Sequence, residues 1–250
     1  AYLTDEGTKI FRLEDHTNRL FESADAVNME IPFSKDKLND VQKEIFKVNN
    51  LEEGYIRPMC FYGAQGMGLR ADNLKTHCIV AAWEWPSYMS PEAFDEGIKI
   101  KISSYKRQTN NLVSRSKVNG NYVTSIMALQ EAMQEGFDEA LLLDDESNIS
   151  EGSGENLFLV KDGMLFTPDL AASLNGITRK SIISLAQEEG IEVKVKKINL
   201  NEILDADELF FTGTAAEVVP IRTVDQNIIA NGQRGPITTI LQKKYFDQVR

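Results

Sequence analysis

The chain has 250 residues, of which 42% are hydrophobic and 26% are charged, and its net charge is −11. A chain of this length and composition can bury one large core or two modest ones, as ordinary globular proteins do. The negative charge argues against a nucleic-acid partner, because phosphate backbones require clustered Lys and Arg. No run approaches the roughly 18 apolar residues of a membrane-spanning helix, and the first residues lack the pattern of an export signal. We therefore expect a cytoplasmic protein with no membrane partner.

The cysteines and histidines predict neither a disulfide framework nor a metal site. Cys60 and Cys78 lack a CxxC spacing, and we interpret them as buried apolar thiols in a reducing compartment. His16 and His77 lie far apart and have no metal-ligand spacing, so we expect structural or surface roles for both.

The first third of the chain predicts a small unit of helices and strands. Its predicted elements are the end of a strand at 1–3, helices over 13–28 and from Ser34 to 48, and strands at 55–62 and 77–83. Two tryptophans, a tyrosine and two prolines follow in 83–91. This composition favours neither a helix nor a strand, so we interpret the segment as part of a connector between two domains.

The remainder of the chain predicts sheets flanked by helices. Its predicted elements are helices over 122–135 and 177–189 and strands at 98–102, 141–143, 157–160, 164–167, 191–195 and 208–212. Gly136 and Gly190 are expected to end the helices, and Asp162-Gly163 is typical of a hairpin turn. Such a mixture indicates an α+β fold rather than a doubly wound parallel sheet.

Two glycine segments could each bind an anion. In Asn175-Gly176-Ile177-Thr178 a glycine loop opens into a helix, where free backbone N–H groups and the Thr178 hydroxyl suit a phosphate. The segment Gly213–Glu217 follows a strand and has the same character. Taken singly, either segment is ordinary turn and cap chemistry.

A lysine and an acid extend this pattern toward one cofactor. Lys117 precedes a polar glycine turn, a position that by itself is typical of a surface charge, and Glu151 lies among small residues. Pyridoxal phosphate requires a lysine for its Schiff base, an acid for its pyridinium nitrogen and helix-end amides for its phosphate. The four features together therefore predict a pyridoxal-phosphate site.

Seven segments carry a family resemblance. SKVNGNYVTS, ISEGSGENLF, NGITR and FFTGTAAEVVPI occur in this order, together with FRLEDHTNRLFESA (11–24), GYIRPMCFYG (54–63) and RGPIT (234–238). The set closely resembles the branched-chain aminotransferases of the fold-type-IV pyridoxal-phosphate enzymes. The resemblance implies a two-domain α+β fold like that of D-amino-acid aminotransferase, and a homodimer or larger homo-oligomer.

The resemblance also implies a domain division. We expect a small domain over 1–82, a connector over 83–95 and a large cofactor-binding domain over 96–250. Other members begin some tens of residues earlier, so the first strands of the small domain are expected to be missing from this sequence.

The resemblance assigns the cofactor contacts. Lys117 matches the Schiff-base lysine, which also moves the proton between the substrate α-carbon and the cofactor. Tyr122 matches the tyrosine beside the phenolic oxygen, and Glu151 matches the partner of the pyridinium nitrogen. The residues that match phosphate ligands are Arg19, Ile177, Thr178 and Thr214.

The substrate contacts follow in the same way. Tyr55 and the amides of Thr214 and Ala215 match groups that hold the α-carboxylate. Arg57 matches the arginine that receives the side-chain carboxylate of glutamate. Trp85 and Tyr88 fall on the connector that closes over the substrate.

The implied reaction is transamination of leucine, isoleucine or valine with 2-oxoglutarate or glutamate, so the expected partners are amino acids and 2-oxo acids. Two alternatives share the fold: a D-amino-acid aminotransferase and an aminodeoxychorismate lyase. GYIRP and AAWEWPSY favour the branched-chain enzymes. A protein that merely binds a phosphate ligand is disfavoured by Lys117 with Glu151, because binding alone needs no electron sink.

Overall fold

The structure, a computed structural model, describes residues 1–85, 88–109 and 115–250. The chain divides into two compact units, Ala1–Pro86 with Val249–Arg250 and Ser87–Gln248. Two elements overlap the range 83–95 that was expected as a connector. Strand β4 (Thr76–Trp83) extends to its first residue, and helix α3 (Pro91–Glu96) begins at Pro91, a residue favoured at the first helical position.

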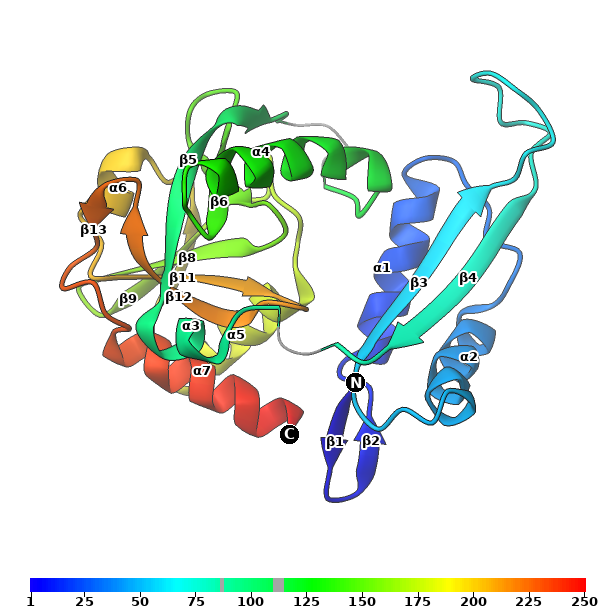
Figure 1. The fold of residues 1–250 in the computed structure, drawn as a ribbon, viewed down its shortest axis with the longest axis horizontal. Helices are drawn as coiled ribbons and strands as arrows, with labels where there is room; N and C mark the ends of the chain where they lie inside the picture. Colours follow the sequence, from blue (N-terminus) through cyan, green and yellow to red (C-terminus); the bar gives the residue numbers. More distant parts are fainter. Residues whose placement is uncertain (86–87, 110–114) are drawn as a thin grey trace. The chain divides into compact units, whose positions relative to one another are not determined.

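The first unit pairs two helices with a β-hairpin (Figure 1). Its remaining elements are β1 (Tyr2–Thr4), β2 (Gly7–Lys9), α1 (Leu13–Asp25), α2 (Lys35–Val48) and β3 (Tyr55–Tyr62). The Ser34 hydroxyl accepts a hydrogen bond from the Lys37 N–H at 3.2 Å, which confirms the predicted cap of α2. The predicted strand at 55–62 is confirmed as β3, whereas α1 ends three residues before the predicted end at 28.

The hairpin β3–β4 has one covered and one open face. The strands are antiparallel and paired from Tyr55 opposite Trp83 to Tyr62 opposite Thr76. Helix α1 packs on β3 and α2 packs on β4. In β4 the side chains at even positions are half-buried, while His77, Ile79 and Ala81 are exposed. Side chains alternate between faces along a strand, so these exposed residues mark the open face.

The second unit is built on a mixed sheet, in which the structure describes nine strands in the order β10-β9-β8-β11-β12-β5-β6-β7, with β13 beside β12. The strands are β5 (Ile98–Arg107), β6 (Glu139–Asp144), β7 (Ile149–Gly152), β8 (Asn156–Lys161), β9 (Met164–Pro168), β10 (Val193–Lys196), β11 (Glu208–Gly213), β12 (Glu217–Val224) and β13 (Asn227–Ile228). The pairs β9–β10, β5–β12 and β5–β6 are parallel and the others antiparallel. This mixture confirms the α+β prediction.

Helices cover parts of this sheet (Figure 1). They are a short 3-10 turn η1 (Asn119–Asn121), α4 (Tyr122–Gln134), α5 (Ile177–Glu188), α6 (Leu200–Leu204) and α7 (Pro236–Val249). Helix α4 packs on β5 and β6, α5 on β11 and α3 on β12. The buried Glu208 carboxylate accepts hydrogen bonds from the N–H groups of Ile237 and Thr238, and so fixes the start of α7. Leu141, Leu157 and Phe211 are fully buried in the core beneath these helices.

None of the helices within the described ranges is long and apolar enough to span a bilayer. Residues 1–85, 88–109 and 115–250 also contain no cluster of three His, Cys, Asp or Glu side chains placed to bind a metal ion.

Candidate active site

Lys117 and Tyr122 are brought together by the turn that starts α4. Lys117 Nζ donates a hydrogen bond to the Tyr122 hydroxyl at 2.5 Å, and it lies 5.1 Å from the centre of the Tyr122 ring. The turn is closed by Asn121, whose side-chain amide donates to the Ser116 carbonyl at 3.1 Å. Lys117 is exposed and Tyr122 half-buried, so the amine is accessible while its position is set by the phenol.

Glu151 is a buried carboxylate with a partner on each oxygen. Its Oε2 accepts the Leu174 N–H at 3.0 Å, and its Oε1 lies 3.2 Å from Nε of Arg107. Burial raises the pKa of Glu151 above its ordinary value, although Arg107, the Leu174 N–H and Lys117 each act to lower it. A buried carboxylate with a nearby cation can pair with a cationic ring nitrogen, because each of its oxygens has a second lone pair.

Arg107 links the parts of this site and was not identified from the sequence. It ends β5 and donates hydrogen bonds to the Asn121 carbonyl at 3.0 Å and to the Ser125 hydroxyl at 2.7 Å. A longer contact of 3.4 Å reaches the Ser153 carbonyl. One guanidinium therefore joins the start of α4, the turn after β7 and the Glu151 carboxylate.

Two further buried acids lie beside this turn. The pKa of Glu155 is raised well above its ordinary value, by burial first and then by the charge of Glu139, and the Gly154 N–H only partly offsets this. Burial raises the pKa of Glu139 to about 6. Tyr88 is 38% exposed, and its pKa is raised by burial and by the same two carboxylates. Tyr88 is therefore electrostatically coupled to the acids behind the site.

At the first predicted anion site a glycine leads directly into helix α5. Gly176 precedes α5 without any side-chain cap, which leaves the N–H groups at the helix start available. A Cβ at Gly176 would clash with Asn156 Oδ1, so any side chain here would force the Asn156 side chain to shift. Asn156 also donates to the Leu174 carbonyl at 2.8 Å, and the Leu174 N–H binds Glu151. The segment 174–178 thus runs from the buried carboxylate directly to the helix start.

The second predicted anion site lies beside the same turn. A Cβ at Gly213 would contact Glu155 Cγ at 3.4 Å and the Gly154 carbonyl at 3.6 Å. Thr214 is exposed and Ala215 half-buried, and Glu217 has a φ of 56° where the chain returns into β12. Three segments, 151–155, 174–178 and 213–217, therefore lie close together in the second unit.

A cleft joins the central residues of the site. Arg107, Lys117, Tyr122, Glu151 and Gly154 line it, with Ser116, Asn121, Ser153 and Leu174 between them. An amine, a phenol and a buried carboxylate on one cleft match the groups needed around a pyridine ring, and the uncapped start of α5 suits a phosphate. The donor set of this cleft therefore fits pyridoxal phosphate.

Three of the residues predicted to bind substrate form a cluster in the first unit. The Tyr55 ring lies 4.7 Å from that of Trp85 and 5.4 Å from that of Trp83. The Arg57 guanidinium lies 5.5 Å from the centre of the Tyr55 ring and 5.3 Å from that of Trp83. Tyr55, Arg57 and Trp83 share the open face of the hairpin. Trp83, which was not predicted as a site residue, joins this cluster because it lies opposite Tyr55 in the strand pair.

Arg19 also lies in the first unit, on α1. Its Nη2 is 3.4 Å from His16 Nδ1. The role predicted for it at the phosphate stays a prediction.

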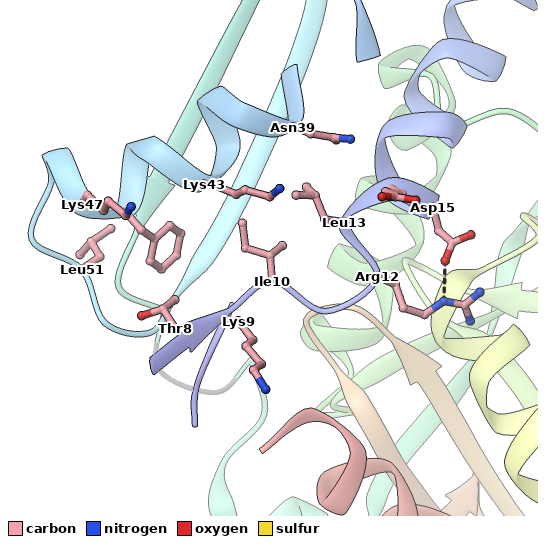
Figure 2. Close-up of a pocket in the computed structure, with 12 residues that line it drawn as sticks. Thr8, Lys9, Ile10, Arg12, Leu13, Asp15, Asn39, Lys43, Lys47 and Leu51 are labelled. Carbon is pink, nitrogen blue, oxygen red and sulfur yellow. Dashed lines mark hydrogen bonds and ion pairs between the residues drawn. The ribbon is translucent and has the colours of Figure 1, made fainter. Parts of the chain in front are cut away.

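A second cavity lies between α2 and the segment that leads into α1 (Figure 2). It measures about 800 Å³, and its lining combines apolar residues such as Ile10 and Leu13 with cations such as Lys43. Arg12, also in the lining, forms an ion pair with Asp15 at 2.7 Å. None of the residues predicted to bind cofactor or substrate lines this cavity.

Comparison with known proteins identifies the family. Residues 3–224 match the family described as amino-transferase class IV. A branched-chain-amino-acid aminotransferase of Pseudomonas aeruginosa is 54% identical over 250 residues, which are 100% of this chain and 81% of the relative. The chain belongs to the branched-chain aminotransferases of class IV.

Solved structures agree with this membership. The crystal structure of the Escherichia coli branched-chain amino acid aminotransferase has a TM-score of 0.96 at 40% identity, covering 98% of this chain and 82% of that one. The branched-chain aminotransferase of the archaeon Thermoproteus uzoniensis, solved with norvaline, has a TM-score of 0.94 at 36% identity, with 100% and 82% coverage. These relatives favour the branched-chain enzymes over the D-amino-acid aminotransferase and lyase alternatives.

Proposed function

We propose that this class IV aminotransferase uses pyridoxal phosphate to transaminate leucine, isoleucine and valine with 2-oxoglutarate or glutamate. The observation that carries the proposal is the cleft in which Lys117 Nζ contacts the Tyr122 hydroxyl beside the buried Glu151. The names of the relatives support the branched-chain substrates. Structures of other branched-chain aminotransferases with pyridoxamine phosphate or with a phosphopyridoxyl-glutamate adduct support the cofactor.

The cleft residues have distinct tasks in this proposal. Bound pyridoxal phosphate supplies an electron sink for the negative charge that develops at the substrate α-carbon. The Lys117 amine takes the proton from the substrate α-carbon and delivers it to the cofactor. Tyr122 holds the amine in place through its hydroxyl. Glu151 keeps the pyridine nitrogen protonated, and Arg107 in turn favours the ionised form of Glu151.

The phosphate is held by Ile177, Thr178 and Thr214, with Arg19 as a further ligand. Ile177 and Thr178 occupy the first turn of α5, where free N–H groups and the helix dipole favour an anion. Thr214 lies on the segment beside Gly154 and Glu155. This arrangement would set the ring between the helix start and the Lys117 amine.

Substrate is bound by Tyr55, Arg57, Trp85 and Tyr88, together with the amides of Thr214 and Ala215. An aminotransferase of this class must place both an aliphatic side chain and a carboxylate in one pocket. An unpaired carboxylate buried there would be costly. Arg57 fits both needs, because its guanidinium lies over the Tyr55 and Trp83 rings, where it can also bind a carboxylate through two contacts.

The domains in this proposal are those expected from the sequence: 1–82 as the small domain, 83–95 as the connector and 96–250 as the large cofactor-binding domain. The protein acts in the cytoplasm as a homodimer or a larger homo-oligomer, with amino acids and 2-oxo acids as its small-molecule partners.

The test is the absorption spectrum of the purified protein loaded with pyridoxal phosphate. We expect a visible cofactor band that bleaches on addition of L-leucine or L-glutamate and stays unchanged with D-alanine. Bleaching with D-alanine alone would indicate a D-amino-acid aminotransferase. No visible band in the wild type and in Lys117→Ala alike would overturn the assignment of Lys117.

A further inference from the structure

The two cysteines of the chain are partners across the hairpin of the first unit. Cys60 on β3 lies directly opposite Cys78 on β4, and the two Sγ atoms are 3.1 Å apart. Both are free thiols and both are half-buried. The prediction of two buried thiols is therefore wrong as to burial, and it missed that the pair are neighbours.

The geometry is suited to a covalent link. Directly opposed residues of an antiparallel pair hold their Cβ atoms about 4.5–5.5 Å apart, and a disulfide requires about 3.5–4.5 Å. The side chains already point toward each other, as their sulfur separation demonstrates. A small approach of the two strands is enough to close the bond.

We propose that Cys60 and Cys78 form a redox-active dithiol that small-molecule disulfides, such as oxidised glutathione, convert reversibly to an intramolecular disulfide. In the first step one cysteine thiolate attacks a sulfur of the oxidised glutathione, and one reduced glutathione leaves. In the second step the other cysteine attacks the mixed disulfide, and the second glutathione leaves. The protein loses two electrons and two protons, and the glutathione disulfide gains them as two thiols.

The surroundings of Cys60 affect its reactivity. Burial raises the pKa of Cys60 to about 12, and the hydrogen bond and charge of Cys78 act in the same direction. The thiolate is the nucleophile, so a thiol in this state reacts slowly with an external disulfide. When Cys78 has formed the mixed disulfide, both effects of Cys78 end and Cys60 ionises more easily, which favours closure of the disulfide.

The position of the bond sets its effect on the protein. Cys60 on β3 and Cys78 on β4 both lie at half-buried positions, on the face opposite the one that carries Tyr55, Arg57 and Trp83. A hairpin of two strands is only marginally stable by itself. A crosslink behind this cluster fixes the register of the strands that carry it. Oxidation is therefore expected to slow amide hydrogen exchange in β3 and β4.

The test equilibrates the cofactor-loaded wild-type protein in glutathione buffers of increasing oxidised fraction. Free thiols are then trapped with an alkylating agent, and the intact mass is measured. We expect two alkylated cysteines in reducing buffer and none in oxidising buffer, with a mass lower by two hydrogens and only traces of glutathione adduct. If the folded protein shows two alkylated cysteines in every buffer while the unfolded protein forms the disulfide, the proposal is overturned.

Two matched variants test the two-step route. Cys60→Ser and Cys78→Ser are each expected to accumulate a glutathione adduct on the remaining cysteine, because neither variant has a second thiol to displace it. Accumulation of a stable adduct on the wild type would show that the second thiol does not resolve it, which would also overturn the proposal. The readout is mass and hydrogen exchange, so failure here is independent of the aminotransferase assignment.

Discussion

Replacing Arg107 with leucine removes the cation that accompanies a buried carboxylate. Arg107 lies 3.2 Å from Glu151 and also donates to Asn121 and Ser125. Breaking a buried ion pair from one side costs about 3–5 kcal/mol, because the remaining charge stays buried and uncompensated. We therefore expect Arg107→Leu to lower the free energy of unfolding by about 3–5 kcal/mol at pH 8.

The loss should depend on pH in a defined direction. Burial already raises the pKa of Glu151 above 4.5, and Arg107 is the first of the groups that oppose this rise. Without Arg107 the pKa rises further. A carboxyl with a raised folded-state pKa contributes stability that is fully present below about pH 4.5 and is lost as pH rises through the folded-state pKa. The difference between Arg107→Leu and wild type should therefore be smallest near pH 5 and increase toward pH 8.

Urea unfolding followed by circular dichroism at pH 5, 6.5 and 8 measures this difference. Arg70→Leu removes an arginine of an exposed pair with Asp72 and should change stability little at any pH. The double variant Arg107→Leu/Glu151→Gln should recover most of the stability at pH 8 but none of the turnover, because a neutral amide cannot hold the ring nitrogen protonated. A loss that is equal at pH 5 and pH 8 would refute the pairing of Arg107 with an ionised Glu151.

Three further variants test the remaining roles. Lys117→Ala should abolish both half-reactions while the unfolding transition stays near that of wild type, since Lys117 is exposed; near-normal turnover would contradict its role. Arg57→Leu should slow the glutamate half-reaction roughly thirtyfold to several-thousandfold more than the leucine one in stopped-flow spectra, since loss of the charged pair costs about 2–5 kcal/mol, and equal losses would move glutamate recognition elsewhere. Glu155→Gln should equal wild type in stability near pH 4 and exceed it increasingly as the pH rises toward 9, because the unfolded wild type ionises Glu155 above about pH 4.5 while the raised folded-state pKa opposes that ionisation; a variant no more stable than wild type at pH 9 would indicate that Glu155 ionises freely in the folded state.

Local sequence patterns predicted the elements whose periodicity is uninterrupted. The strand at 55–62 and the start of the helix at Tyr122 agree with the structure to the residue. Helix α3 was missed. It begins at Pro91, directly after Ser90, but the aromatic residues and prolines of 83–91 hid this helix start. Strand β12 was also missed, because Glu217 and Pro220 are unfavourable strand residues. Pairing with β11 and β5 on its two sides outweighs this local preference.

Only those site residues that lie in family motifs or in glycine turns were predicted from the sequence. Lys117, Tyr122 and Glu151 were identified, and the structure brings these three together on one cleft. Arg107 was not, because a lone arginine at the end of an alternating strand resembles a surface charge. The one available signal was physical: a buried carboxylate at position 151 requires a cation, and none of its sequence neighbours provides one. The Cys60–Cys78 pairing was invisible until the strand register was known.

Glu151 near the end of β7 and Glu155 in the turn after it are buried acids with opposite tasks, and their partners explain the difference. Glu151 has Arg107, an N–H group and Lys117 around it, all of which favour its ionised form. Glu155 faces Glu139 and Glu151, and both carboxylates oppose its ionisation. Glu155 therefore stays protonated to higher pH than an ordinary glutamate. A second full negative charge there would repel both the phosphate and the α-carboxylate of the proposed ligands, so a neutral Glu155 leaves the cleft able to accept anions.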